Sequence, residues 1–498
     1  MIRQFLATVG QLGSTGETLL QSGQRELTRT ELLAVVEDLA ARLEKLGLRC
    51  VALHADNGID WIVADFACQL AEIRITPVPL FFSDTQFRHA IEDSGADALI
   101  SDQQDVMRIL DGDLIPARDQ RDDGPTKLYL LGPGRSAQLP DGTQKITFTS
   151  GTTGTPKGVC LSSDQQFGVA SAITSVLDLE QPKHLCVLPL STLLENLAGV
   201  YTPLLAGGTV VAPPLAELGL TGSSDLDIGK LLSCIDQHQP NSMILVPELL
   251  NALTLAAESS WRPPSSLQFV AVGGGKVAAD LLHRSRHAGL PAYEGYGLSE
   301  CASVVSLNVP GTDRLGTVGR PLPHVDVQIE GGQIVVTGSE FLGYANQPHT
   351  WDSGPIATGD IGHADNCGFI YVDGRAKNQI ITSFGRNLSP EWVEAELTAG
   401  PLLQQAVLFG DARPFCVALV HPRQISVGDE EISAWIHRIN QRLPDYARVL
   451  DWYRLPAALS NHKGMTTENG RPKRRIVEQE YASAIEHMYE NSLEACNQ

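Results

Sequence analysis

The first hundred residues alternate between two hydrophobic patterns, and this alternation restricts the fold more than any other feature of the sequence. Apolar residues recur at spacings of three and four from Leu32 to Leu46, which predicts an amphipathic helix that ends at Gly47. The pattern continues with predicted strands at 50–55 and 75–80, a helix at 64–73, and a helix followed by a strand at 87–102. Helices and strands that alternate at these lengths predict an α/β fold with a parallel sheet.

The alternation returns in the second third of the chain, at residues 186–211 and 243–253. Residues 267–277, LQFVAVGGGKV, then place three glycines directly after an apolar strand. Ligands tend to bind at the carboxyl ends of strands in open parallel sheets, so Gly274 is a candidate ligand-binding residue. Residues 111–145 are rich in Asp, Gly, Pro, Arg and Gln, and are predicted to form a polar loop.

Between these regions, residues 146–161 read ITFTSGTTGTPKGVCL. Glycines allow a backbone to turn tightly and bring its N–H groups close to a ligand, and hydroxyls with Lys157 suit a polyphosphate. The segment is not a Walker A loop, because Gly158 and not Ser or Thr follows the lysine. Segments of this composition are also common as plain surface turns, so the rest of the chain must decide its meaning.

In the order of its residues, this segment resembles the nucleotide-binding signature of the adenylate-forming superfamily, which includes acyl-CoA synthetases, luciferases and peptide-synthetase adenylation domains. The resemblance implies a large amino-terminal AMP-binding α/β domain with parallel sheets, residues 1–375, and a small mobile α+β domain, residues 376–498. It also implies that the segment binds ATP through Thr149, Ser150, Gly151, Thr152, Thr153, Gly154 and Lys157.

The sequence YEGYGLSE, which ends at Glu300, resembles the superfamily's Tyr-Gly-x-(Ser/Thr)-Glu motif. The ring of Tyr296 can stack on adenine, and Gly297 separates it from the Ser299 hydroxyl, which can bind phosphate. The Glu300 carboxylate can hold Mg²⁺, for which Thr149 is the second candidate ligand. This motif therefore predicts a magnesium-nucleotide site.

Three further residues complete the predicted site and its hinge. Asp360 lies in a Thr-Gly-Asp turn, where a fixed carboxylate can accept both hydroxyls of a ribose. Arg375 resembles the ribose- and phosphate-contacting arginine of the superfamily, and Lys377 falls at the expected hinge between the two domains. The following loop, residues 383–387, departs from the usual Gly-Gly-Glu-Asn because Arg386 replaces the glutamate.

The most consequential departure concerns the carboxyl-terminal catalytic lysine of the superfamily, which usually follows Asn-Gly. After Asn469-Gly470, its place is taken by Arg471, and Lys473 follows two residues later. Arg471 keeps the charge and the register, whereas Lys473 keeps the compact ammonium. The run is also compatible with a solvated basic surface, which is what most charge runs are. Both residues are catalytic candidates, and the choice between them stays open.

The resemblance implies that a carboxylate attacks the α-phosphate of ATP, that pyrophosphate leaves, and that a thiol then displaces AMP. The thiol belongs to coenzyme A or to a phosphopantetheinyl acyl carrier protein. Amino-acid-activating relatives carry Phe-Asp before the acid pocket, whereas residues 188–195 read LPLSTLLE without an aspartate. This segment is similar to that of long-chain acyl-CoA synthetases, with Thr192 in place of a histidine.

The expected substrate is therefore a fatty or otherwise apolar carboxylic acid. Two alternatives remain: a stand-alone adenylation enzyme for an aryl or amino acid, and a pseudo-enzyme that binds ATP without turnover. Acid-dependent pyrophosphate exchange restricted to aryl or amino acids would indicate the first alternative. Binding of ATP without pyrophosphate release would indicate the second.

Composition restricts the partners and the compartment. The chain has 37 Lys and Arg against 58 Asp and Glu, a net charge of −21, which argues against a general nucleic-acid binder. The nine cysteines form no Cys-x-x-Cys pair, so neither a disulfide framework nor a zinc site is expected. With no signal-peptide or membrane-spanning pattern, we expect a cytoplasmic enzyme, and peripheral membrane contact is left open.

Overall fold

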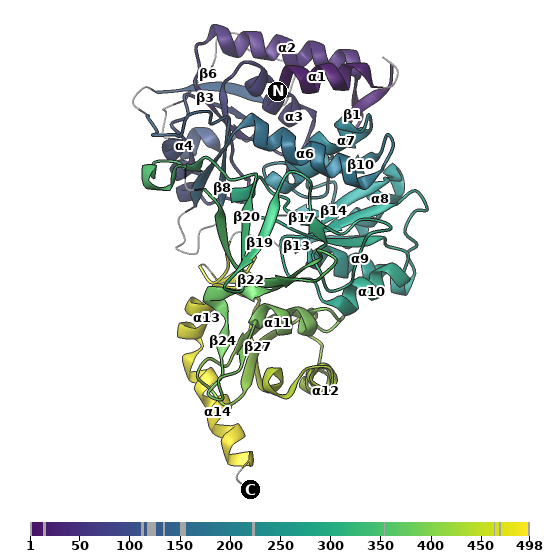
Figure 1. Cartoon of the computed structure of the whole chain (residues 1–498), viewed down its shortest axis with the longest axis vertical. Coiled ribbons are helices and arrows are strands. Elements are labelled where there is room, and N and C mark those ends of the chain that lie inside the picture. Colours follow the sequence, from purple (N-terminus) through teal and green to yellow (C-terminus); the bar gives the residue numbers. More distant parts are fainter. Residues whose placement is uncertain are drawn as a thin grey trace.

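The chain forms a large α/β body and a smaller α+β body, which Figure 1 shows stacked along the long axis, with the carboxyl terminus at the far end of the smaller body. The computed structural model describes residues 2–12, 16–110, 114–116, 126–132, 135–149, 156–221, 225–352, 354–462, 464–467 and 470–496. Within these residues, no helix is both long enough and apolar enough to cross a membrane.

The first sheet of the large body has the parallel core that the sequence predicts. Strand β3 lies between β4 and β5, both parallel to it, and β4 continues to β8. Antiparallel strands complete both edges, in the order β21-β9-β8-β4-β3-β5-β7-β6. The strands are β3 (Cys50–His54), β4 (Arg74–Pro77), β5 (Ala98–Ser101), β6 (Leu114–Pro116), β7 (Lys127–Leu131), β8 (Lys145–Thr149), β9 (Lys157–Leu161) and β21 (Gly343–Tyr344).

The prediction of a polar loop over residues 111–145 is wrong for two segments. Strands β6 and β7 form an antiparallel pair, and β7 extends the sheet beside β5. Leu128 and Leu131 are buried, so the gain from covering apolar surface outweighs the polar composition around them. The helix predicted at 64–73 is observed at Ile59–Leu70, because it already begins after Gly58.

The second sheet has the order β18-β17-β16-β15-β14-β10-β11-β1-β2. Strands β16, β15, β14, β10, β11 and β1 run parallel to one another, antiparallel strands complete both edges, and the glycines that follow β15 lie at its carboxyl end, as predicted. The strands are β1 (Thr18–Ser22), β2 (Arg25–Thr28), β10 (Lys183–Leu185), β11 (Thr209–Val211), β14 (Ser242–Leu245), β15 (Phe269–Val272), β16 (Ala292–Tyr296), β17 (Ser306–Leu307) and β18 (Arg320–Pro321); β12 (Leu220–Thr221) and β13 (Asp225–Leu226) pair separately.

Helices cover these sheets, and their ends follow from local chemistry. At the start of α2, the Thr28 hydroxyl accepts from the Glu31 N–H while Glu31 accepts from the Thr28 N–H. The helices of the large body are α1 (Ile2–Gln11), α2 (Arg29–Lys45), α3 (Ile59–Leu70), α4 (Asp84–Ser94), α5 (Val106–Ile109), α6 (Ser163–Leu177), the π-helix η1 (Glu195–Tyr201), α7 (Thr202–Leu205), α8 (Ile228–His238), α9 (Pro247–Ser259), α10 (Ala279–His287), and the 3₁₀ turns η2 (Ser299–Cys301) and η3 (Pro348–Thr350).

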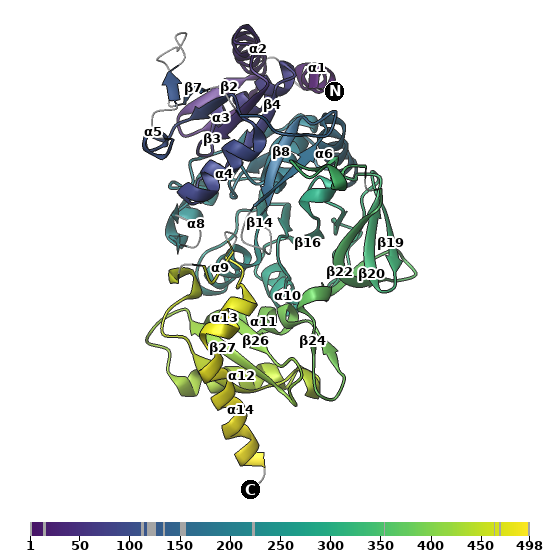
Figure 2. The same cartoon turned by 90° about the vertical axis from the view of Figure 1, so that its left-hand side faces the viewer.

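A four-stranded antiparallel sheet, β19-β20-β22-β23, lies at one side of the large body in Figure 2 and leads into the small body. Two hydrophobic clusters inside the small body contain only residues from Ile380 onward. The elements are β19 (Asp326–Glu330), β20 (Gln333–Thr337), β22 (Ile356–Ala364), β23 (Ile370–Arg375), η4 (Ala376–Asn378), β24 (Ile380–Ile381), β25 (Asn387–Leu388), α11 (Pro390–Thr398), β26 (Leu403–Phe409), β27 (Cys416–Pro422), α12 (Asp429–Asn440), η5 (Asp445–Ala447), β28 (Val449–Arg454), η6 (Leu459–Asn461), α13 (Arg474–Glu480) and α14 (Ala482–Cys496).

Candidate active site

Tyr296, Asp360 and Arg375 meet where the large body adjoins the small one. Tyr296 ends β16, and its hydroxyl donates to Oδ2 of Asp360 over 2.6 Å. Asp360 and Arg375 face each other on β22 and β23, with Nε of the arginine 2.8 Å from Oδ1 of the aspartate. Asp360 is buried, which raises the pKa of its carboxyl, and the Arg375 guanidinium opposes that shift. The carboxylate is therefore held rigidly by two donors.

Glu300, Tyr344 and Lys157 form a second group. The Tyr344 hydroxyl donates to Oε1 of Glu300 over 2.7 Å, and Nζ of Lys157 lies 4.9 Å from the centre of the Tyr344 ring. Burial, and then Glu300, raise the pKa of Tyr344, so the phenol stays a donor at neutral pH. Thr149 belongs to the same group through the register of the sheet, because it pairs with Lys157 on neighbouring strands.

A magnesium ion fits this second group chemically. Among the described residues, Tyr344 alone donates to the Glu300 side chain, so the carboxylate keeps acceptor capacity for a cation. Glu300 and Thr149 offer oxygen ligands, which Mg²⁺ prefers. Tyr344 is not among the residues predicted from the sequence, because its local pattern does not indicate that its hydroxyl reaches Glu300.

A strained turn follows Glu300 and explains why Gly297 is a glycine. A Cβ atom on Gly297 would lie 1.5 Å from the carbonyl oxygen of Ser303. Ala302 and Ser303 themselves have φ of 52° and 91°, values that residues with side chains rarely adopt. Such strain concentrates at functional sites, and here it immediately follows the turn η2, which begins at Ser299.

The glycine turn after β15 adjoins a buried acid that the sequence did not single out. Gly274 has φ of 80°, which favours glycine. The charge of Lys276 and the backbone N–H of Val277 both oppose the rise in pKa that burial imposes on Glu294. Lys276 also donates to the Val372 carbonyl. Glu294 is 2% exposed, and burial raises its pKa to about 7. The only sequence signal for it is its position two residues before Tyr296.

The structure distinguishes the surroundings of Arg471 and Lys473. Arg471 is exposed as a residue, but the groups around its guanidinium partly desolvate it, which lowers its pKa; the charge of Arg375 lowers the pKa further, while Glu248, Asp360 and Glu391 raise it. Arg471 thus lies within the electrostatic reach of the Asp360 carboxylate. Lys473 precedes α13, and its backbone N–H donates to the Met465 carbonyl.

Lys377 lies in the middle of η4, the short turn that directly follows Arg375. Lys377 is exposed, and partial desolvation of its side chain lowers its pKa; the charge of Arg375 lowers the pKa further, and Asp360 opposes the shift. The residue therefore sits beside the first group, on the segment that connects the two bodies. The domain boundary at 375/376 and the hinge role of Lys377 stay predictions. Arg386, in the turn between β24 and β25, donates its backbone N–H to the Thr382 hydroxyl.

Asn57 and Glu195 hold the segment predicted to border the acid pocket. The Asn57 amide donates to the Leu188 carbonyl over 2.9 Å and accepts from the Leu190 N–H over 2.7 Å. Oε2 of Glu195 accepts from the Leu188 N–H over 2.9 Å, and Oε1 lies 3.0 Å from Nε2 of His184. Glu195 is fully buried, and both of its carboxyl oxygens already have partners in the core.

His184, Cys186 and Glu195 form the one group of metal-type ligands that the described part of the chain brings together, with their donor atoms within 4.8 Å. The sequence predicted no zinc site, whereas these three side chains do come together. The nitrogen and oxygen atoms that could hold a metal are, however, already hydrogen-bonded within the core. Ser242 and Glu195 occupy the two ring nitrogens of His184, and a Cβ on Gly199 would lie 2.2 Å from Oε1 of Glu195. We interpret it as a hydrogen-bonded core element.

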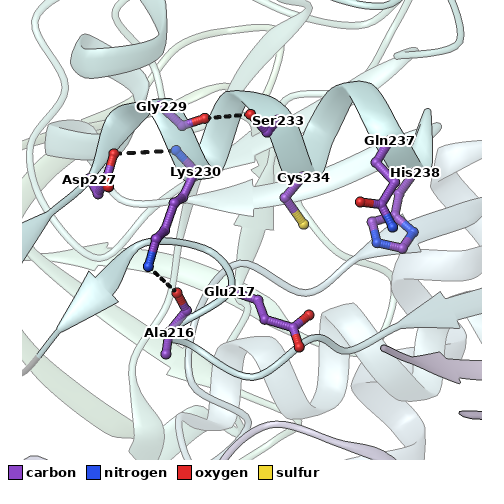
Figure 3. Close-up of a pocket in the computed structure, with 9 residues that line it drawn as sticks. All are labelled: Ala216, Glu217, Asp227, Gly229, Lys230, Ser233, Cys234, Gln237 and His238. Carbon is purple, nitrogen blue, oxygen red and sulfur yellow. Dashed lines mark hydrogen bonds between the residues drawn. The ribbon is translucent and has the colours of Figure 1, made fainter. Parts of the chain in front are cut away.

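A surface groove beside α8 contains none of the predicted site residues (Figure 3). Across it, the Lys230 ammonium donates to the Ala216 carbonyl over 3.4 Å. Burial raises the pKa of the Cys234 thiol to about 11, which leaves it unreactive at neutral pH. The groove is lined by Ala216, Glu217, Asp227, Gly229, Lys230, Ser233, Cys234, Gln237 and His238.

Part of the predicted site lies outside the described residues. Residues 150–155 contain the predicted phosphate-binding residues Ser150, Gly151, Thr152, Thr153 and Gly154, and Asn469 precedes Gly470 in the second such segment. The flanking residues Thr149 and Lys157 are described: they pair with each other on neighbouring strands, and the Lys157 ammonium lies over the Tyr344 ring.

A large α/β body joined to a small α+β body, together with the two groups of residues described above, is the arrangement expected of adenylate-forming enzymes. Residues 12–343 match the family model described as AMP-binding enzyme, and residues 377–493 match the model of the AMP-binding enzyme C-terminal domain. The chain therefore belongs to the AMP-binding enzyme family.

Curated relatives extend over nearly the whole chain. A 2-succinylbenzoate–CoA ligase of Bacillus velezensis is 29% identical over 479 residues, covering 89% of this chain and 90% of the relative. The long-chain-fatty-acid–CoA ligase FadD15 of Mycobacterium bovis is 25% identical, covering 95% and 94%. A feruloyl-CoA synthase of an Amycolatopsis species is 28% identical, covering 84% and 88%.

Solved structures show the same fold. The o-succinylbenzoate CoA synthetase of Bacillus subtilis, bound to its acyl-adenylate, has a TM-score of 0.77 at 23% identity and covers 95% of this chain and 97% of its own. The anthranilate CoA ligase AuaEII, bound to anthranoyl-AMP, has a TM-score of 0.80 at 18% identity and covers 97% and 98%. The fold prediction is confirmed.

Proposed function

We propose that this protein activates a carboxylic acid with ATP to an acyl-adenylate and then transfers the acyl group to the thiol of coenzyme A. The observation that carries the proposal is the convergence of two groups, Tyr296–Asp360–Arg375 and Glu300–Tyr344–Lys157, from segments far apart in the sequence. The CoA ligases among the relatives support the acceptor.

Each group has a distinct part in the first step. Both reactants are anions, so the site must neutralise charge and align the carboxylate with the α-phosphate. Asp360, fixed by Tyr296 and Arg375, binds the ribose hydroxyls and orients the nucleotide. Glu300 holds Mg²⁺, which supplies charge neutralisation when bound, and Lys157 adds a cation at the end of the phosphate-binding segment. Arg471 or Lys473 neutralises charge where the carboxylate attacks.

We propose that the acid is fatty or otherwise apolar. Burying an unpaired ammonium costs several kcal/mol or more. In the acid-pocket segment, the only carboxylate, Glu195, is turned into the core toward His184 and the Leu188 N–H, which supports the exclusion of α-amino acids. Aromatic acids are the second candidate, because the relatives include a 2-succinylbenzoate ligase and a feruloyl-CoA synthase.

A pyrophosphate-release screen over fatty, aryl and amino acids, each with and without coenzyme A, tests this assignment. We expect release with apolar acids and thioester formation when coenzyme A is added. Release confined to amino acids would contradict the substrate class. ATP binding without release for any acid would indicate a pseudo-enzyme. Replacing coenzyme A by a phosphopantetheinylated acyl carrier protein tests the other acceptor.

Glu300→Gln tests the magnesium ligand. The amide keeps the shape but loses the charge that holds the metal, so ATP–pyrophosphate exchange should fall by at least about a thousandfold. Tyr344→Phe is the matched control, because it removes the hydrogen bond to Glu300 and leaves the carboxylate. Near-normal exchange in Glu300→Gln would contradict the assignment.

Arg471→Ala and Lys473→Ala, measured separately, identify the carboxyl-terminal catalytic cation. The proximity of Arg471 to Asp360 supports Arg471 in the orientation observed. The residue that acts should lose adenylation rate by orders of magnitude, while the other substitution has a small effect. If neither variant is slower, the basic run has no role in adenylation.

A further inference from the structure

We propose that the carboxyl-terminal end of α11 and its two large-body donors, Asn251 and Arg284, form a latch that holds the small body in the orientation for adenylate formation. The latch consists of these two side chains and the carbonyl groups of Thr398, Ala399 and Gly400. The proposal rests on the proposed function, and it assigns positioning roles to Asn251 and Arg284, neither of which contacts the site.

The contacts join the two bodies directly. The Asn251 amide, on α9, donates to the Thr398 carbonyl over 3.0 Å and reaches the Gly400 carbonyl at 3.5 Å. Nη1 of Arg284, on α10, donates to the Ala399 carbonyl over 2.7 Å. Figure 1 shows α11 at the top of the small body, below α9 and α10. The last carbonyls of a helix have no partner within the helix and carry partial negative charge, so they favour such donors.

Apolar packing reinforces the latch. Ala399 is 6% exposed and belongs to a hydrophobic cluster of the large body, against which Ala395 also packs. These two alanines are the small-body members of a cluster otherwise formed by residues 185–292. Their side chains are small, so the contact excludes water over a limited area and can separate at modest cost.

Helix α11 carries this anchor to the basic segment of the site. Glu394, in the middle of the helix, lies 2.6 Å from Nη1 of Arg474, and Arg474 follows Arg471 by three residues. Glu391, in the first turn of α11, raises the pKa of both Arg471 and Asp360 through its charge. One rigid helix therefore connects the latch at its end to the residues that position Arg471 at its beginning.

Opening the latch leaves no charged group buried without a partner, although the Asn251 amide gives up its two acceptors. Arg423 of the small body donates to the Thr398 and Gly400 carbonyls, and Trp435 donates to the Leu397 carbonyl, so the helix end keeps partners of its own. Arg284 keeps its two hydrogen bonds to Glu258. Opening therefore exposes the Ala399 carbonyl to water and leaves no charged side chain without a partner. A contact that forms and breaks in each catalytic cycle must meet this condition.

Arg284→Met tests the latch by removing the donor while keeping most of the apolar stem, and Asn251→Leu removes the other donor at similar volume. Adenylation is measured as acid-dependent pyrophosphate release, with dodecanoate or, if the wild type responds only to aryl acids, with benzoate. Thioester formation is measured separately, from the preformed acyl-adenylate and coenzyme A. We expect adenylation to fall at least about tenfold, while the thioester step stays within twofold of wild type or becomes faster.

Arg262→Met is the matched control, because Arg262 also donates to backbone carbonyls, those of Ala257 and Trp261, but only within the large body. It should leave both half-reactions within twofold of wild type. Arg284→Lys, which keeps one donor, should recover part of the lost adenylation rate. Equal losses in both half-reactions of Arg284→Met, or no loss in either, would overturn the latch.

Amide hydrogen exchange over residues 396–403, without ligands, gives a readout that does not depend on activity. Exchange should accelerate several-fold in Arg284→Met and stay unchanged in Arg262→Met. If the wild type releases no pyrophosphate with any acid while exchange still accelerates, the proposed function is wrong and the contact between the bodies is supported. Unchanged exchange in Arg284→Met would overturn the contact itself.

Discussion

The molecule contains two junctions between large structural units, and they are built from different chemistry. The internal junction, between the two main sheets, holds Lys145 of β8 against Asp65 of α3, with Nζ 2.9 Å from Oδ1 and both side chains at most 1% exposed. Tyr201 of η1 donates to the same carboxylate over 2.8 Å. The domain junction, between the two bodies, instead uses backbone carbonyls and the Asp280–Arg442 ion pair, whose side chains are 35% and 53% exposed.

This difference predicts which junction can move. Separating the internal junction would expose a buried ion pair together with the rings of Phe5, Phe66, Phe167 and Tyr201, whose centres lie 5.1–5.5 Å apart. At the domain junction, water can replace each protein donor at little cost. We therefore expect the large body to act as one unit, and we propose that the small body is the part that rotates.

The largest expected effect is on the internal junction. Asp65→Asn leaves the Lys145 ammonium buried without a counter-charge, and should lower the free energy of unfolding by about 3–5 kcal/mol. Asp60→Asn, on the same helix, is the matched control, because it breaks the more exposed Arg25–Asp60 pair and should cost less than about 1 kcal/mol. Urea unfolding measures both, and equal losses would contradict the comparison.

The second prediction concerns a buried acid within the large body. Burial raises the pKa of Glu294 to about 7 from the usual 4.5, so the native state keeps a proton that the unfolded chain has lost. Stability should therefore fall as pH rises from about 4.5 to about 7, and remain lower above it. Glu294→Gln removes this loss, so the variant should be more stable than wild type by up to about 3 kcal/mol at pH 8.

At pH 4 the Glu294→Gln variant and the wild type should be almost equally stable, because both side chains are then uncharged. Urea unfolding of the two proteins at both pH values isolates this one group from all others that titrate. A stability difference that does not change with pH would show that Glu294 has no raised pKa.

The third prediction concerns the hinge. Lys377→Pro fixes φ at one residue of η4 and disfavours the helical region for Ala376 before it, so rotation should stall in one orientation. One half-reaction should slow about tenfold or more while the other is preserved. Lys377→Ala separates the loss of charge from the loss of backbone freedom. Wild-type rates for both steps in Lys377→Pro would show that the hinge lies elsewhere.

The smallest effect should come from the exposed ion pair at the domain junction. Asp280→Arg or Arg442→Asp alone should change the ratio of the two half-reaction rates by less than about fivefold, which corresponds to the fraction of a kcal/mol typical of such pairs. The double exchange should restore the ratio. If either single variant lowered the free energy of unfolding as much as Asp65→Asn does, the domain junction would not be built to open.

Much of the fold could be predicted because its signals are periodic. The spacing from Leu32 to Leu46 gave α2, and the glycines after β15 were placed at the carboxyl end of their strand. The β6–β7 pair was missed, because the short apolar run 128–131 stands among polar residues whose composition indicates a loop. Whether this run forms a strand is decided by its burial against the sheet edge, and that burial depends on residues distant in the sequence.

The candidate site shows a similar division. Tyr296, Asp360 and Glu300 carry motif signals, so the sequence could propose them, but not that Tyr296 would bond to Asp360 and Tyr344 to Glu300. Asn251 and Arg284 could not be predicted at all. Their partners are backbone carbonyls, which any residue supplies, and such contacts leave no pattern in the sequence.

A reversible cross-link across the domain junction tests most directly whether the small body must move. Asp280→Cys and Arg442→Cys, in a background with Cys367→Ser and Cys496→Ser, place two thiols where the ion pair joins the bodies. A bifunctional methanethiosulfonate then links them, and reduction releases the link. The linked enzyme should release pyrophosphate with acid and ATP at close to the unlinked rate, yet form no thioester from coenzyme A until it is reduced. Thioester formation at the unlinked rate while the bodies remain joined would contradict the account.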